Sequence, residues 1–218
     1  MFKLLTNLFR KRRFLQNTTY LSDTAEVLFG SNVQVLASKN SKIFLNGKLI
    51  VGVPLTGTSP GFSHKNSTIV CLGENSTLQI NGDVHIGPGC TIRVGANGTL
   101  TLEGGNVIAH DTTIISTKKI SLGKNTSVSW NCTLIDDDAH SFFRTDGKKI
   151  KKIRKPLLIG NNVGIQMNVL IPSGTKIGNN SIISANTVVR AEVLDNTLIY
   201  TTNEYKTLSN FTTGFQFQ

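Results

Sequence analysis

The amino-acid sequence predicts an all-β fold, a solenoid of short parallel strands. Two observations support this prediction. Seven aliphatic residues recur at unbroken six-residue intervals in the last third of the chain: Ile153, Ile159, Ile165, Ile171, Ile177, Ile183 and Val189. The fifth position of the hexads is also small or β-branched: Val163, Val169, Thr175, Ser181, Thr187 and Val193. A helix repeats near 3.6 residues and a strand near 2, so a period of six indicates short strands joined by tight corners.

Three hexads make one triangular coil, and each coil buries its apolar face against the coils above and below it. Ile159-Gly160 and Ile177-Gly178 begin equivalent corners one coil apart. Asparagines follow both glycines, and this composition suits corners where the backbone adopts a positive φ.

The chain of 218 residues divides into three parts. Residues 1–28 form an amphipathic, basic segment that we expect to be helical and to cap the open end of the solenoid, as solenoids require. Residues 29–196 contain the repeats. Residues 197–218 form a C-terminal extension whose fold the pattern does not define.

Composition limits the partners. The net charge is +10, but 11 of the 23 basic residues lie in the stretches 3–13 and 148–155, and the other 12 nearly balance 13 acidic residues. Two local patches differ from the basic face of a nucleic-acid-binding protein, so no nucleic acid is expected. No secretory signal or membrane-length apolar run is present, and we expect a cytoplasmic protein. Contact of the basic N-terminus with an anionic membrane surface is an open alternative.

Two of the three cysteines, Cys90 and Cys132, occupy the fifth position of hexads that begin at Ile86 and Val128. That position points inward in the repeat, so we expect both cysteines to be packing residues.

The repeat breaks at one informative place. Leu122, Val128 and Leu134 predict the next inward position at residue 140, which is His140, and the ladder resumes out of phase at Ile153. An insertion, residues 141–152, must therefore leave the coil after His140. It is polar and basic and contains a Thr-Asp-Gly turn signal. Loop excursions from a repeat are where function concentrates.

A histidine at an inward corner position is costly unless its nitrogens are used. Asp138 or Asp136 could hold the imidazole in one tautomer and stabilise its protonated form, a pair suited to removing a proton from a hydroxyl. Two alternatives remain open, a solvated polar corner and a metal site. No metal is expected, because the other histidines lack the spacing of a ligand set.

Several motifs together resemble the hexapeptide-repeat acyltransferases, which have a left-handed β-helix fold, and among them the O-acetyltransferases of bacterial capsule and O-antigen polysaccharides. These motifs are the hexad ladder, Ser129-Trp130-Asn131, Asp138-Ala-His140, Lys155-Pro156-Leu-Leu-Ile159-Gly160 and Ser184-Ala-Asn-Thr-Val-Val189. The resemblance implies a homotrimer with active sites between subunits, acetyl-CoA as co-substrate, and His140 as the general base of direct transfer.

By matching positions, the resemblance implies coenzyme A contacts at Gly164, Ala185, Arg190 and Lys206. The chain departs from the family where a Trp-Ile-Gly run is replaced by Val163-Gly164 and where a Gly-Asn-Pro-Ala-Lys motif is reduced to Asn203 and Lys206. As acceptor contacts we expect Trp130, Asn131 and, in the basic loop, Lys152. That loop could bind coenzyme A phosphates or an anionic glycan, or be merely solvated.

The leading hypothesis is an acetyl-CoA-dependent O-acetyltransferase that acts on a sugar hydroxyl of a bacterial surface polysaccharide or its precursor. N-acetylation of a nucleotide-linked amino sugar in the same fold is a second hypothesis. A non-catalytic β-helix that serves as a scaffold or binding module is a third.

Overall fold

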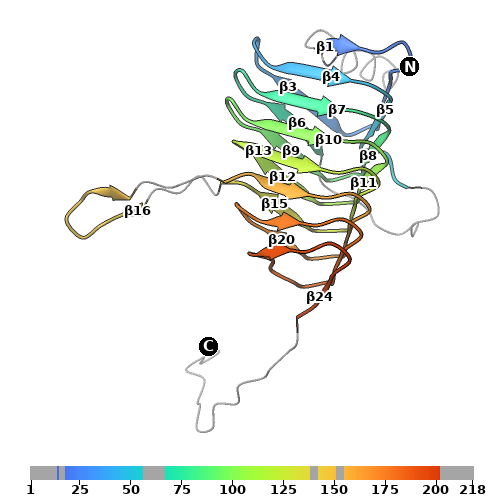
Figure 1. Ribbon diagram of the computed structural model, residues 1–218. Helices are drawn as coiled ribbons and strands as arrows, with labels where there is room; N and C mark the ends of the chain where they lie inside the picture. Colours follow the sequence, from blue (N-terminus) through green and yellow to red (C-terminus); the bar gives the residue numbers. More distant parts are fainter. Residues whose placement is uncertain (1–13, 15–17, 56–66, 138–141, 151–154, 202–218) are drawn as a thin grey trace, which may run out of the picture.

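The computed structural model describes residues 14, 18–55, 67–137, 142–150 and 155–201, and these residues form a stack of triangular coils (Figure 1). Each full coil contributes one short strand to each of three parallel sheets that run along the stack. We call these sheets A, B and C, in the order in which the chain passes through them before it returns to sheet A. The predicted parallel solenoid is therefore confirmed.

Neighbouring strands of one sheet come from successive coils. Sheet A consists of β1 (Thr18–Leu21), β4 (Lys42–Leu45), β7 (Thr77–Ile80), β10 (Thr99–Leu102), β13 (Lys119–Leu122), β18 (Leu157–Ile159), β21 (Lys176–Ile177) and β23 (Glu192–Val193). Sheet B consists of β2 (Glu26–Phe29), β5 (Lys48–Val51), β8 (Val84–Ile86), β11 (Asn106–Ile108), β14 (Ser127–Val128), β19 (Gly164–Ile165), β22 (Ile182–Ile183) and β24 (Leu198–Ile199). Sheet C consists of β3 (Val33–Ala37), β6 (Thr68–Leu72), β9 (Thr91–Val94), β12 (Thr113–Ser116), β15 (Thr133–Ile135) and β20 (Leu170–Ile171).

The hexad ladder forms the core of the C-terminal coils. From Ile159 to Val189 every aliphatic of the ladder is buried, and so is every residue at the fifth position of its hexads. Ile153 lies outside the described residues. Because side chains alternate across a strand, each two-residue strand directs one side chain into the core and one outward.

Coil length changes along the stack. The paired residues Leu78 and Leu100 differ by 22 in number, whereas Ile159 and Ile177 differ by 18. The earlier coils are longer because most of their strands have three to five residues rather than two. This explains why the six-residue period is loose before residue 120 and strict after residue 157.

Asparagines with positive φ form the corners. At the corner between sheets A and B, Asn125, Asn162, Asn180 and Asn196 have φ of 54–57°. The side-chain amides of the first three each donate to the next asparagine along the stack, at 3.1–3.3 Å. Asparagine tolerates the left-handed region, and the stacked amides satisfy one another at the surface.

The buried cysteines behave as small apolar residues. Cys90 and Cys132 are 0% and 1% exposed, as predicted, and their thiols donate to the carbonyls of Ala109 and Gln166 at 2.9 and 3.0 Å. Burial raises the pKa of the Cys90 thiol to about 12 and also raises that of Cys132. Cys71 is half-buried.

Alkylation should therefore separate the three cysteines. At about pH 8 we expect iodoacetamide to label Cys71 in the folded protein well before Cys90 or Cys132, because the thiolate is the reactive form and both buried thiols stay protonated. Peptide mass spectrometry of timed samples measures this order, and urea-unfolded protein serves as the control in which all three react. Equal labelling of the folded protein would contradict the burial.

The insertion contains a hairpin. Strands β16 (Phe142–Phe143) and β17 (Lys149–Ile150) pair antiparallel, and Figure 1 shows the hairpin standing away from the coils. Gly147, at the predicted turn, has φ 79° and donates its backbone N–H to the carbonyl of Arg144 at 2.9 Å. The hairpin falls within the predicted insertion 141–152.

The strands of the solenoid begin at Thr18 and end at Ile199, outside the expected limits 29–196 at both ends. The expected capping segment 1–28 thus includes β1 and most of β2. Before these strands the described residues contain Phe14, which is fully buried and packs edge-on against Phe29 with ring centroids 5.7 Å apart. In the described part of the chain, no helix is long and apolar enough to cross a membrane.

Candidate functional site

Asp136 is anchored at the root of the insertion. It follows β15 directly and is fully buried. Its carboxylate accepts the backbone N–H groups of Thr117, Lys118 and Lys119 at 2.6, 2.9 and 2.8 Å, all from the turn of the preceding coil. The hydroxyl of Thr117 donates to it as well, at 3.0 Å. The Ser116 hydroxyl lies 3.2 Å from the carboxylate but donates its one proton to the carbonyl of Thr99, at 2.7 Å. Three consecutive N–H groups form an anion-binding nest, and Asp136 fills it.

This arrangement bears on the predicted acid–base pair. Four donors, the three N–H groups and the Thr117 hydroxyl, use the acceptor capacity of one carboxylate, so Asp136 holds the corner in place and has no acceptor site left for an imidazole. His140 and Asp138 lie outside the described residues, and their pairing stays a prediction. Of the two aspartates considered, Asp138 is the one whose carboxylate remains a candidate partner for His140.

Trp130 and Asn131 occupy the corner between sheets B and C. Asn131 is a corner residue with φ 54°, and its amide donates to Asn168 of the next coil at 2.8 Å. Trp130 is 38% exposed, and its ring lies 6.0 Å from the ring of the buried His110, tilted by 43°. The corner therefore offers an indole surface and a ladder of amides, groups that suit contact with a sugar.

The sequence analysis considered His110 only as a metal ligand and did not predict its position beside Trp130. Its backbone carbonyl accepts the N–H of Asn131 at 3.1 Å, so His110 stands one coil before Trp130 in the same corner. The signal that could have predicted this contact is the coil length near residue 120. Leu100 pairs in register with Ile120, so one coil is 20 residues long there. His110 and Trp130 are also 20 residues apart and therefore occupy equivalent positions in successive coils.

The expected acceptor contacts and the root of the insertion lie at opposite ends of β15. Trp130 and Asn131 precede the strand, and Asp136 follows it. The outer face of sheet C between them carries Thr133 and Ile135, both half-buried. A ligand that touches both corners of one chain must therefore lie across the outer face of sheet C. Lys152 lies outside the described residues.

The residues matched to coenzyme A contacts do not form one pocket within a chain. Gly164 is on sheet B in β19, and a Cβ placed there would meet only Ile182, at 3.9 Å. Ala185 follows β22 and donates its N–H to Gln166 at 3.1 Å. Arg190 is exposed and lies across sheet C from Ala185, beyond the bridge between Leu170 and Val188. Lys206 lies outside the described residues.

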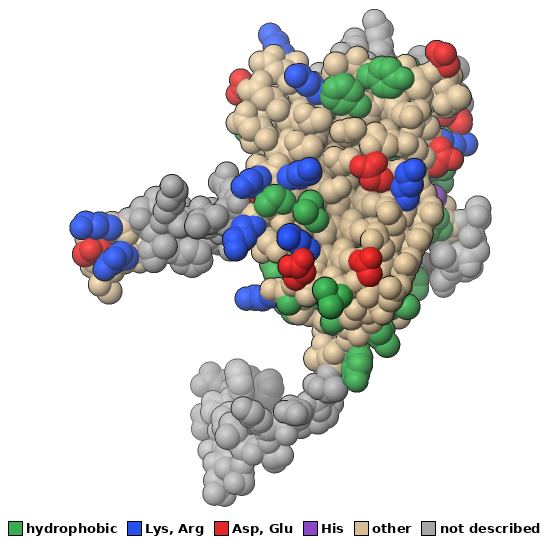
Figure 2. Space-filling view, viewed as in Figure 1, with side chains coloured by type: hydrophobic (Ala, Val, Ile, Leu, Met, Phe, Trp, Pro, Cys, Tyr) green, Lys and Arg blue, Asp and Glu red, His purple; other side chains and the backbone are tan. Residues whose placement is uncertain are grey.

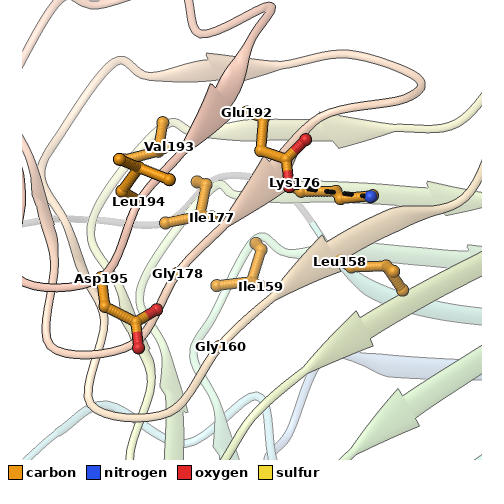
Figure 3. Close-up of a pocket in the computed structure, with 10 residues that line it drawn as sticks. All are labelled: Leu158, Ile159, Gly160, Lys176, Ile177, Gly178, Glu192, Val193, Leu194 and Asp195. Atoms are coloured by element: carbon orange, nitrogen blue, oxygen red, sulfur yellow. Dashed lines mark ion pairs between the residues drawn. The ribbon is translucent and has the colours of Figure 1, made fainter.

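A shallow hollow of about 550 Å³ lies on sheet A at the C-terminal coils (Figure 3). Gly160 and Gly178 line it, together with Lys176, whose ammonium pairs with Glu192 at 3.7 Å. None of the residues expected to be functional lines it. Among the described residues, no three His, Cys, Asp or Glu side chains are grouped to hold a metal ion.

Comparison with known proteins adds the family. Residues 157–191 match the model of the bacterial transferase hexapeptide family, described as six repeats. Residues 157–191 thus carry the hexapeptide repeat that is typical of this transferase family. The structure extends the same coil architecture from Thr18 to Ile199, well beyond the matched residues. The fold is thus a left-handed parallel β-helix, as the resemblance implies.

Three relatives are similar over part of the chain. An uncharacterized 24.8 kDa protein in the cps region of Klebsiella pneumoniae is 28% identical over 123 residues, 56% of this chain and 52% of its own. The putative acetyltransferase YvoF of Bacillus subtilis (strain 168) is 35% identical over 86 residues, 39% of this chain and 45% of its own. The galactoside O-acetyltransferase of Escherichia coli (strain K12) is 28% identical over 127 residues, 57% of this chain and 56% of its own.

This hexapeptide-repeat chain therefore spans about half the length of the curated relatives that it matches. Among solved structures, the polysialic acid O-acetyltransferase OatWY is 18% identical with a TM-score of 0.47, over 84% of this chain and 94% of that one.

Proposed function

We propose that this protein is an acetyl-CoA-dependent O-acetyltransferase that acetylates a sugar hydroxyl of a bacterial surface polysaccharide, in a capsule or O-antigen, or of its precursor. The match of residues 157–191 to the hexapeptide transferase family and the similarity to a galactoside O-acetyltransferase support the reaction class. The similarity to a protein of a cps region supports a surface polysaccharide as the acceptor.

One observation carries the proposal: the coil is interrupted where His140 stands in the sequence. The described residues of the insertion between β15 and β18 add no strand to the three sheets of the β-helix. The chain must also be held in place where it leaves the coil. Asp136 provides that anchor with four hydrogen bonds. A polar loop that leaves a rigid, hydrogen-bonded corner of the scaffold is typical of a functional loop.

In the proposed reaction His140 accepts the proton of the acceptor hydroxyl while the hydroxyl oxygen attacks the thioester carbonyl of acetyl-CoA. A C–O bond forms, the C–S bond breaks, and the proton passes from His140 to the departing thiolate of coenzyme A. General-base assistance contributes about 10²- to 10⁴-fold. Orientation of the two substrates in one cleft supplies a further part of the acceleration.

For the co-substrate we propose contacts at Gly164, Ala185, Arg190 and Lys206. The open space over Gly164 supports this assignment, because a flat β-helix surface lets an extended ligand lie close to the backbone. The separation of Arg190 from Gly164 fits a co-substrate that is held between two copies of the chain.

We propose that the protein is a homotrimer in the cytoplasm, with contact between the basic N-terminus and the membrane surface as an open alternative. The outer face of sheet C supports self-association. It exposes Leu36 and Val188 at 46% and 52%, and between these two coils Ile115, Ile135 and Leu170 are half-buried on the same face.

Coenzyme A binding separates the acetyltransferase from a non-catalytic scaffold. At millimolar coenzyme A we expect the melting temperature to rise, because a ligand that binds only the folded state stabilises it. Differential scanning fluorimetry measures the shift, and adenosine monophosphate at the same concentration is the control. An unchanged melting temperature at saturating concentrations would favour the scaffold.

A further inference from the structure

Three lysines gather where the insertion leaves and rejoins the β-helix. Lys118 and Lys119 form the turn into β13, and Lys155 lies at the same corner of the next coil, two residues before β18. The pairing of Ile120 with Leu157 brings these turns side by side. We call Lys118, Lys119 and Lys155 the basic corner. All three are exposed, and Figure 2 shows basic side chains gathered on this edge, beside the hairpin.

Hydrogen bonds fix the backbone on both sides of the basic corner. Asp136 binds the N–H groups of Lys118 and Lys119, as described above. Ser173 accepts the N–H of Lys155 at 3.0 Å and donates its hydroxyl to the carbonyl of Lys155 at 3.1 Å. The side-chain stem of Lys155 lies over Gly174, where a Cβ would come within 3.1 Å of it. The ammonium groups therefore extend from a rigid base.

Two lysines of the basic corner, Lys119 and Lys155, lack the ion pairs that other lysines of the described residues form. Elsewhere Lys48 pairs with Glu26 at 3.0 Å and Lys176 pairs with Glu192 at 3.7 Å. Within the described residues, no carboxylate lies within 4.0 Å of the ammonium of Lys119 or Lys155. The nearby carboxylate of Asp136 accepts backbone N–H groups, including those of Lys118 and Lys119.

The sequence of the insertion adds to this excess. Residues 117–119 and 136–155 contain nine basic and four acidic residues. Like charges held close together repel one another, and an exposed anion relieves that repulsion. A fixed cationic corner on an otherwise nearly neutral β-helix therefore favours a polyanionic partner at this place.

We propose that the basic corner binds an anionic glycan, one that bears carboxylate or phosphodiester groups along its chain. The inference rests on the proposed function in that the glycan is the acceptor. The basic corner lies at the root of the insertion that follows His140 in the sequence. The proposed coenzyme A contacts lie elsewhere, Gly164 on sheet B and Ala185 at the corner between sheets B and C. The proposed binding site for the acidic groups of the acceptor thus lies at the root of the insertion, and the proposed coenzyme A contacts lie on other parts of the β-helix.

Direct binding tests the proposal without acetyl-CoA. The probes are polygalacturonate, its carboxyl-reduced neutral form and a phosphodiester-linked teichoic acid, measured by isothermal titration calorimetry at low ionic strength. The test variant is Lys119→Gln/Lys155→Gln. The control variant, Lys48→Gln/Lys124→Gln, changes net charge equally but removes lysines away from the insertion. Circular dichroism checks that both variants are folded.

We expect the test variant to bind one or both anionic polymers about tenfold more weakly than wild type or worse, while the control stays within about twofold. Equal losses in both variants, or equal wild-type binding to the neutral polymer, would overturn the proposal. So would a test variant that binds glycan normally but loses the thermal shift with coenzyme A, since the corner would then serve its phosphates. Lysine-dependent binding without any acetyl transfer would leave this inference standing and refute the proposed reaction.

Discussion

Replacing His140 by alanine is expected to lower acetyl transfer by about 10²- to 10⁴-fold, the usual contribution of a general base. Coenzyme A should still raise the melting temperature of the variant, because the proposed co-substrate contacts are elsewhere. Initial rates of thiol release from acetyl-CoA, followed with an acceptor glycan present, measure the effect.

The matched control is His85→Ala. His85 lies on β8, and its Nε2 forms a hydrogen bond with the carbonyl of Val53 at 2.7 Å, away from the insertion. This variant should keep its transfer rate after correction for any loss of folded protein. Full activity of His140→Ala would remove His140 from the mechanism and leave a direct role to another group.

Replacing Asp136 by alanine is expected to reduce the free energy of unfolding by about 3 to 5 kcal/mol, the cost of removing one partner from a buried charged network. Three backbone N–H groups, those of Thr117, Lys118 and Lys119, would lose their acceptor at once. Urea denaturation followed by circular dichroism measures the change in midpoint.

Asp195→Ala provides the comparison. Asp195 also accepts a backbone N–H, that of Asn179 at 2.8 Å, but it is exposed at the corner, where water can replace it. Its loss should cost about 1 kcal/mol or less. If the two variants unfold at similar urea concentrations, Asp136 is not the anchor that its hydrogen bonds indicate.

Much of the fold could be predicted because the hexad places one aliphatic and one small residue inward in every segment. Ile159 to Val189 obey this rule without exception, and all are buried. The upstream boundaries could not be predicted as well. There the longer strands set coil lengths of 20 and 22 residues, and a fixed six-residue count drifts out of register.

The place of the insertion could be predicted from the sequence, but the way in which it is anchored could not. The missing hexad marked the insertion, since a repeat that fails to continue must leave the coil. The role of Asp136 could not be foreseen, because its partners lie 17 to 19 residues earlier and meet it only when the coils stack. The stacking of coils also brings Lys118 and Lys119 close to Lys155. It likewise places the ring of Trp130 beside that of His110.

Acetyl transfer itself tests the central claim most directly. The purified protein is incubated with acetyl-CoA and a panel of anionic and neutral bacterial glycans, and acetyl esters on the products are detected by mass spectrometry. We predict base-labile acetyl esters on an anionic glycan with the wild-type protein and almost none with His140→Ala. Acetyl groups that resist mild base, as amides do, or no transfer to any glycan although coenzyme A binds, would contradict the account.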